Sequence, residues 1–213
     1  MFPRAINSLP FQVIVYLCLL AGVATAGVNY YMTPKYTRVG YAPIQPVPYS
    51  HAKHVGELGL DCRYCHNTID TAGSALPTAQ TCMNCHSEIT NSSPALATVR
   101  ESFQSGVPIR WVRVNVMPSF VYFDHAVHVN RGVGCVECHG RVNRMEVVTQ
   151  MQPMSMGFCL DCHRAPEWRL RDKKDVFNLD SQPIAALRGR EAALRFAQDW
   201  NIKPTQDCSG CHR

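Results

Sequence analysis

The chain has 213 residues and a formal net charge of +5, and 46% of its residues are hydrophobic, which is typical of a folded protein and not of a disordered one. The charge is mild and contains no long basic run, so the composition argues against a nucleic-acid-binding protein. Eleven Cys is an unusual count, and an ordinary disulfide framework is excluded because ten of them fall into one repeated pentapeptide.

The first expected element is an N-terminal helix. Residues 11–32 carry no charge and are long enough to cross a bilayer as one helix, with Pro10 at its entry and Pro34 beyond its end. The alternative is a cleaved signal peptide, because residues 24–26 (Ala-Thr-Ala) resemble a cleavage site. We expect residues 1–33 to form a retained single-pass anchor with a short cytoplasmic tail.

The next segments show little regular periodicity. Residues 34–50 contain four Pro and are expected to form an extended linker. Residues 51–167 are expected to be loops and short helices. A short C-terminal helix is predicted at about 183–200, where Pro183 suits the first turn and Gly189 weakens the middle.

Five pentapeptides of the form CxxCH follow one another along the chain. CxxCH is the attachment signature of c-type haem, in which the two thiols add to the vinyl groups of one porphyrin and the next residue supplies the proximal imidazole. A structural zinc site would use CxxC pairs two at a time, and a thioredoxin-like motif occurs once beside a βαβ pattern. The sequence therefore predicts five covalently bound c-type haems, attached at Cys62 and Cys65 (His66), Cys82 and Cys85 (His86), Cys135 and Cys138 (His139), Cys159 and Cys162 (His163), and Cys208 and Cys211 (His212).

Four further His form two HxxH pairs, each 10 or 11 residues before a CxxCH motif: His51 and His54, His125 and His128. We interpret all four as distal iron ligands, since a haem with two imidazoles suits electron transfer and leaves no room for substrate. The stretch PYSHAKHVGELGLDCRYCH resembles VYFDHAVHVNRGVGCVECH, and a second CxxCH follows each. This repeat predicts dihaem modules at 51–105 and 106–167, followed by a C-terminal region, 168–213, with the fifth haem.

Nine His serve ten axial positions, so one haem lacks a His partner. Met is the usual substitute, and a Met/His pair raises the reduction potential. Four Met precede Cys159, and at most one of them can be the missing ligand, while the others suit packing against porphyrin: Met145, Met151, Met154 and Met156.

An HxxH pair followed by CxxCH resembles the cytochrome c3/c7 family. In that family the first His of a pair ligates the nearest following haem and the second reaches another. The resemblance implies the pairings His51 with His66, His54 with His86, His125 with His139, and His128 with His163. It leaves the His212 haem for a Met near Cys159, with Met156 nearest and Met145 and Met154 as alternatives. Crossed pairings between the modules are a further alternative.

The whole chain resembles a second family. An N-terminal span, two HxxH dihaem modules and the run PMSMGFCLDCHRAPEWRLRDKKDVFN before a terminal CxxCHR are similar to the pentahaem subunit of alternative complex III. That resemblance implies a relay without a catalytic site of its own, passing electrons from a quinol-oxidising complex to a periplasmic acceptor or a terminal oxidase. Its implied partners are an iron–sulfur subunit, integral quinol-binding subunits and a monohaem cytochrome c. The implied location is the bacterial cytoplasmic membrane, with the haem domain on the periplasmic side, where c-type haems are matured.

Two other classes remain as alternatives. A multihaem reductase needs an open iron site, often with Lys in place of the CxxCH His, and no such Lys occurs here. A stand-alone membrane quinol dehydrogenase of the NapC/NrfH type has its first haem motif close to the membrane exit, whereas about 29 residues separate Met32 from Cys62 here.

Overall fold

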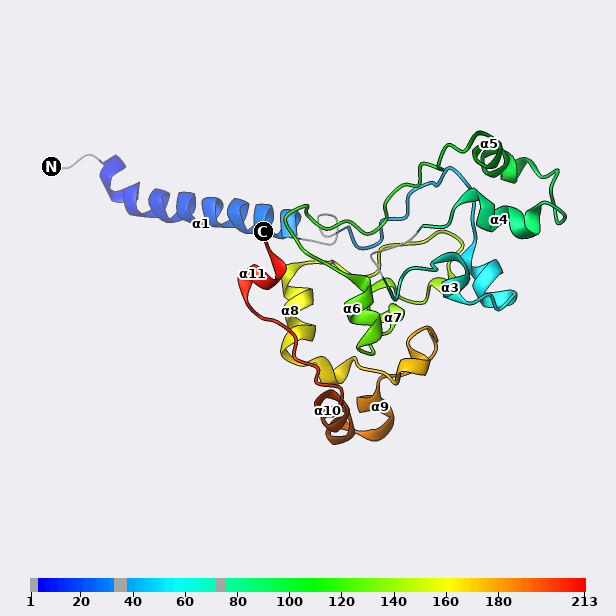
Figure 1. Cartoon of the computed structure of the whole chain (residues 1–213). Coiled ribbons are helices and arrows are strands. Elements are labelled where there is room, and N and C mark those ends of the chain that lie inside the picture. The colour runs from blue at the N-terminus through cyan, green and yellow to red at the C-terminus, as the bar shows by residue number, and fades with distance from the viewer. Residues whose placement is uncertain (1–3, 33–37, 72–75) are drawn as a thin grey trace.

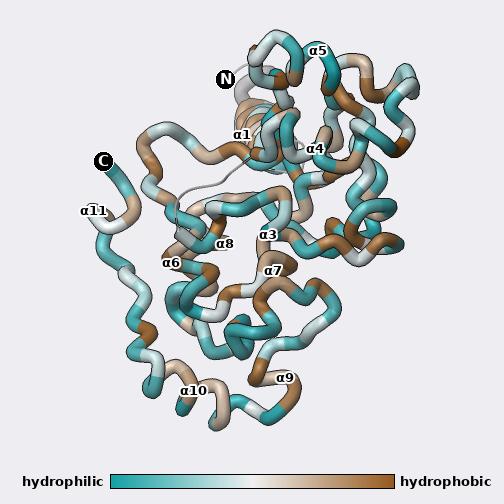
Figure 2. Tube along the Cα trace, turned by 45° about the vertical axis from the view of Figure 1, so that its right-hand side comes forward, coloured by the Kyte–Doolittle hydropathy of each residue, from teal (hydrophilic) through white to brown (hydrophobic). Residues whose placement is uncertain are grey.

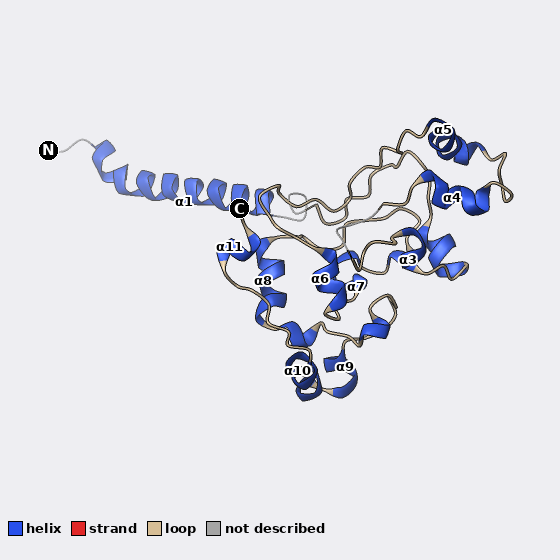
Figure 3. Ribbon diagram, viewed as in Figure 1, coloured by secondary structure: helices blue, strands red, loops and turns tan. Residues whose placement is uncertain are grey.

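The computed structural model describes residues 4–32, 38–71 and 76–213. Helices and loops make up this described part, which contains no named strand, and its only bridges are the isolated antiparallel pairs Val121 with His212 and Val133 with Leu170 (Figure 3). The prediction of a mostly helical and irregular fold is confirmed.

Helix α1 (Arg4–Met32) is the one long helix of the described chain and projects from the rest as a rod (Figure 1). Its Ser8–Tyr31 part has a mean hydropathy of 2.1 and no buried residue, so it can cross a membrane by length and composition. A signal sequence near the N-terminus would have the same properties. Pro10 lies inside α1 and not at its entry, which corrects the expected start of the helix.

The predicted linker is extended but docked. Gly40 donates its N–H to the Gln150 carbonyl (2.8 Å), and Gln150 donates to Tyr41 (3.0 Å). The Gln45 amide both donates to and accepts from the Val112 backbone, at 2.9 Å in each direction. Residues 38–50 therefore lie along the haem-motif region and do not act as a free spacer, while residues 34–37 fall outside the described part.

The remaining helices are short. They comprise η1 (Ala52–Glu57), α3 (Cys62–Cys65), α4 (Ala79–His86), η2 (Pro94–Leu96), α5 (Ala97–Ser105), α6 (His125–Asn130), α7 (Cys135–His139), η3 (Val142–Arg144), α8 (Met156–Arg164), η4 (Pro166–Trp168), η5 (Lys173–Asp175), α9 (Ile184–Arg188), α10 (Arg190–Asp199) and α11 (Cys208–Cys211). Outside α1, apolar and polar residues alternate along the tube without a long apolar stretch (Figure 2).

The helix predicted over 183–200 is broken in two. Pro183 precedes α9, and Gly189 separates α9 from α10 with φ +82° and ψ 163°. This backbone region is essentially restricted to glycine, so the residue that weakened the predicted helix is the one that ends it. The two halves pack on each other through Ile184, Ala185 and Ala193.

The polypeptide has little apolar core of its own. Two small clusters of buried residues are present, one around Val47, Ala79, Met83 and Val99 and the other between α9 and α10. The chain has 14391 Å² of accessible surface, against about 9,900 Å² for a compact protein of this mass. Exposed α1 contributes to the difference. Four further buried apolar residues of the described chain lie outside both clusters: Val129, Leu170, Val176 and Leu179.

Candidate haem sites

Each CxxCH motif lies on a helical turn. The Cys pairs occupy α3, α4, α7, α8 and α11. Residues three apart share one face of a helix, so each turn presents its two thiols together. Polar caps begin two of these turns: Asp61 accepts from the Arg63 N–H (2.8 Å), and Ser155 Oγ accepts from the Phe158 N–H (3.3 Å). No disulfide joins any of the eleven Cys, all of which lie in the described part of the chain.

Three of the expected His pairs meet ring to ring. The ring centres are 6.1 Å apart for His54 and His86, 6.3 Å for His125 and His139, and 6.2 Å for His128 and His163. The angle between the rings varies widely across these pairs, at 66°, 10° and 43°. The distance between ring centres is thus nearly constant, whereas the angle between the ring planes is not. This is expected when both rings point a nitrogen at a common point, and it is not expected when rings pack face to face.

The separation fits one metal ion between the two rings. Two metal–nitrogen bonds of about 2.0 Å plus two imidazole half-widths of about 1.1 Å put the ring centres roughly 6.2 Å apart. Within the described residues, no group of three or more His, Cys, Asp or Glu gathers as metal ligands do, so these imidazoles meet in twos. Paired imidazoles suit a haem iron, whose four equatorial positions come from the porphyrin.

Hydrogen bonds at the other ring nitrogen support the same arrangement. Four Nδ1 atoms lie 2.6–3.0 Å from backbone carbonyl oxygens: His54 from Ser50, His86 from Ile89, His128 from Asp124 and His163 from Thr205. A carbonyl only accepts, so each Nδ1 carries the proton and each Nε2 keeps a free lone pair. Metal-binding His commonly have such partners, which fix the tautomer and the ring orientation.

The partner of His139 Nδ1 is a side chain instead of a backbone carbonyl. Its Nδ1 lies 3.1 Å from Asn115 Nδ2, while Asn115 Oδ1 is buried without a partner. Turning the amide by 180° places Oδ1 against Nδ1–H and satisfies both groups, and the choice between amide orientations is made on such networks. No sequence pattern indicates Asn115 as a partner of His139, because it lies 24 residues away in an irregular segment.

His51 lies among the other imidazoles of the centre. Burial, and next the charge of His66, lowers the pKa of His51 to about 4. Burial, followed by His125 and His66, lowers the pKa of His139 to about 4 as well. Both rings are therefore neutral at pH 7, which is the form that binds a metal. His51, His66, His125 and His139 belong to one neighbourhood.

The sequence repeat has a structural counterpart that includes an aromatic ring. Tyr49 stacks on His54 with ring centres 4.4 Å apart and meets His51 edge-on at 4.8 Å. Phe123 stacks on His128 at 4.7 Å and meets His125 edge-on at 4.7 Å. The repeated unit is therefore aromatic-x-HxxH, with the aromatic ring holding both imidazoles. The aligned repeats contain this aromatic residue, which the spacing of the His alone does not indicate.

The fifth motif is attached to the segment before the second HxxH pair. Tyr122 donates its N–H to the Cys211 carbonyl (2.8 Å), Arg213 donates to the Phe120 carbonyl (3.0 Å), and the Phe120 ring lies 5.8 Å from His212. The C-terminal residues 208–213 therefore pack against residues 119–122, which lie just before His125 in the sequence.

The Met candidates lie in different places. Met156 begins α8, three residues before Cys159, and is 61% exposed. Burial raises the pKa of the Cys159 thiol, and the charge of Cys211 raises it further. The fourth and fifth motifs are therefore neighbours. Met145 and Met151 pack instead around Gly140, beside the third motif. Met156 is therefore better placed than Met145 for the His212 haem.

The motifs follow a spatial order that differs from their order in the chain. Burial is the main cause that raises the pKa of Cys65, and it raises the pKa of Cys135 and of Cys138 to about 11. The next cause in each case is a Cys of another motif: Cys82 acts on Cys65, Cys62 on Cys135, and Cys162 on Cys138. Figure 1 shows the same sequence of helices across the molecule, from α4 through α3, α7 and α8 to α11. A haem bound at a motif would supply a one-electron Fe(III)/Fe(II) couple, and the chain's own residues would hold and orient the imidazoles that ligate it.

Comparison with known proteins agrees with this picture for part of the chain. Residues 121–213 match the family model of cytochrome c7 and related cytochrome c, which spans three of the five motifs. The chain is also 36% identical over 97 residues to the multihaem cytochrome c subunit of menaquinone reductase from Nitratidesulfovibrio vulgaris. That match covers 45% of this chain and 45% of the relative, so it spans less than half the relative's length. These matches show that residues 121–213 are similar to the cytochrome c7 family, and the paired imidazoles agree with that similarity.

Proposed function

We propose that the chain is a five-haem electron relay subunit of a membrane quinol-oxidising complex of the alternative complex III type. It takes electrons from a neighbouring subunit and passes them on to a periplasmic acceptor or a terminal oxidase. Its haems are those attached at the five CxxCH motifs, with the four HxxH imidazoles and Met156 as distal ligands.

The main observation in favour of an electron-relay function is that the imidazoles lie in pairs. Three pairs have ring centres 6.1–6.3 Å apart, and His51 lies near the charge of His66. A haem with both axial positions filled exchanges electrons without binding substrate, so these sites favour a relay over a multihaem reductase. The ordered row of motifs supports the same role.

Helix α1 supports a membrane location. It is long and apolar enough to span, and as an anchor it would hold the haem domain at the outer face of the cytoplasmic membrane. The partners proposed are an iron–sulfur subunit, integral quinol-binding subunits and a monohaem cytochrome c.

A second candidate reverses the direction of electron flow. The relative is named as a subunit of menaquinone reductase, which favours a relay that delivers electrons to a quinone instead of receiving them from a quinol. The two candidates share the haem sites and differ in the complex that surrounds them.

The test is purification of the native complex from membranes in detergent, followed by mass spectrometry of its subunits and two assays. We expect the haem subunit to carry five haems by intact mass and the complex to reduce cytochrome c with a menaquinol analogue as donor. Reduction of a menaquinone analogue by a reduced cytochrome, without quinol oxidation, would favour the second candidate. Purification of a single chain without partners, active alone on quinol, would contradict both.

A further inference from the structure

The two dihaem modules touch through backbone at a position that has no room for a side chain. Helix η1, which follows His51, packs on η3, which follows His139. A Cβ atom at Gly56 would collide with the carbonyl oxygen of Asn143. Ala52 also donates its N–H to the Met145 carbonyl (3.0 Å) across the same contact. Glycine at position 56 thus permits the closest approach of the modules.

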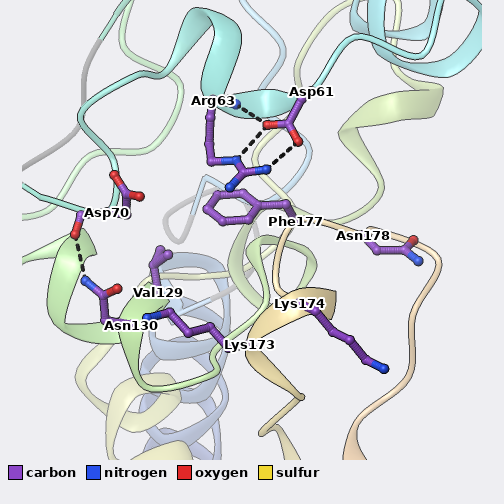
Figure 4. Close-up of a pocket in the computed structure, with 9 residues that line it drawn as sticks. All are labelled: Asp61, Arg63, Asp70, Val129, Asn130, Lys173, Lys174, Phe177 and Asn178. Carbon is purple, nitrogen blue, oxygen red and sulfur yellow. Dashed lines mark hydrogen bonds and ion pairs between the residues drawn. The ribbon is translucent and has the colours of Figure 1, made fainter.

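A second contact closes the other side of this interface. Asn130 donates its side-chain amide to the Asp70 carbonyl at 2.6 Å. Figure 4 shows this bond at the rim of a cavity of about 480 Å³, with Arg63 and Asp61 above and Phe177 between them and Asn178. The cavity is lined by the first module, the second module and the segment after η5, so it marks the junction of all three.

The segment after η5 lies between the two Cys motifs. Val176, only 1% exposed, accepts the Cys135 N–H at 3.3 Å, and the next carbonyl, of Phe177, lies 3.9 Å from the Cys62 sulfur. The Arg63 guanidinium covers the Phe177 ring at 4.7 Å. Two successive peptide units therefore contact the first and the third haem motifs.

We propose that electrons cross between the two dihaem modules through the haems attached at Cys62 and Cys135, and that the Gly56–Asn143 contact and Phe177 set the distance of that crossing. With haems bound at these two motifs, the step would move one electron and no atom: the ferrous haem at one motif would be oxidised as the ferric haem at the other is reduced. The order of the path is then second, first, third, fourth and fifth motif. Gly56 and Phe177 are positioning residues, and this inference rests on the proposed relay.

The test compares Gly56→Ala with Gly22→Ala in the full-length, fully haem-loaded protein in detergent. At Gly22, in α1, an added Cβ meets no atom within 4 Å, and the site lies away from the interface and from the haem motifs. Electron redistribution is followed by absorbance after flash photoreduction with a soluble ruthenium photosensitiser, and magnetic coupling between ferric haems by electron paramagnetic resonance. We expect Gly56→Ala to keep five haems and to show a slower redistribution phase and weaker coupling, while Gly22→Ala behaves as the wild type.

Unchanged redistribution and coupling in Gly56→Ala would overturn the inference while leaving the relay intact. If the wild type itself fails to share electrons among its haems, the proposed relay fails first. If Gly56→Ala does not retain five haems, Phe177→Leu replaces it, since this change removes the ring beneath Arg63 and keeps an apolar side chain. A wild-type rate in Phe177→Leu would then overturn the inference.

Discussion

The hydrogen bond between Asn115 and His139 predicts a change in reduction potential whose sign depends on the substitution. As an acceptor, Asn115 makes the imidazole a stronger donor to iron, which stabilises the ferric state and lowers the potential. Asn115→Leu removes the acceptor and leaves Nδ1–H unpaired in a half-buried position. Asn115→Asp supplies a charged acceptor instead, and hydrogen bonds to charged groups are stronger.

The magnitude follows from the worth of one hydrogen bond. A net contribution of about 1 kcal/mol corresponds to roughly 40 mV for a one-electron couple, since about 1.4 kcal/mol equals 59 mV. We expect Asn115→Leu to raise one potential by roughly this amount and Asn115→Asp to lower the same potential by a similar amount. The other haems should keep their potentials, because Asn115 contacts His139, whereas four other Nδ1 atoms contact backbone carbonyls, and that of His86 also contacts Thr90 Oγ1.

The assay is a spectroelectrochemical titration of the full-length protein, fitted globally to all haems, with intact mass as the check that no haem is lost. Shifts of opposite sign in the two variants support the role of Asn115. Equal potentials in both variants and the wild type, or shifts of the same sign, would refute the reasoning, because neither is compatible with an acceptor that acts on His139.

Three further predictions concern other parts of the chain. Met156→Leu should abolish the weak near-infrared band of Met–ferric haem and lower one potential, since a thioether favours the ferrous state; a band that survives would exclude Met156 as the ligand of the His212 haem. Gly189→Ala should destabilise the α9–α10 pair by about 1–3 kcal/mol in denaturant unfolding, because φ +82° with ψ 163° is strained for alanine, and an unchanged midpoint would contradict this. Residues 11–32 should hold the mature protein in membranes washed with high salt, whereas soluble protein starting near Ala26 would support the signal-peptide alternative.

The sequence predicts well what depends on local spacing. The five CxxCH turns are local, because two thiols three residues apart fall on one face of a single helical turn. The His partners that the family resemblance implies for His86, His139 and His163 also lie near them, with ring centres 6.1–6.3 Å apart.

What the sequence could not provide depends on long-range packing. Asn115 reaches His139 from an irregular segment, and Phe177 lies 115 residues from Cys62, with no periodicity to indicate either contact. The docking of residues 38–50 was hidden by their Pro content, which favours extended backbone but does not say what that backbone lies against. The break at Gly189 was visible as a weakness, although its φ value was not.

The scarcity of buried apolar side chains has a consequence for biogenesis. The two small clusters share no residue, and among the described motifs only the second takes part in one of them, through Met83 and Cys82. A newly exported chain would then gain most of its resistance to proteases only as cofactors are attached, so the yield of protein should follow the capacity of the attachment machinery. Losing one attachment site should lower the abundance of the entire subunit. The steady-state amount of the subunit in the cell would then report whether its set of haems is complete.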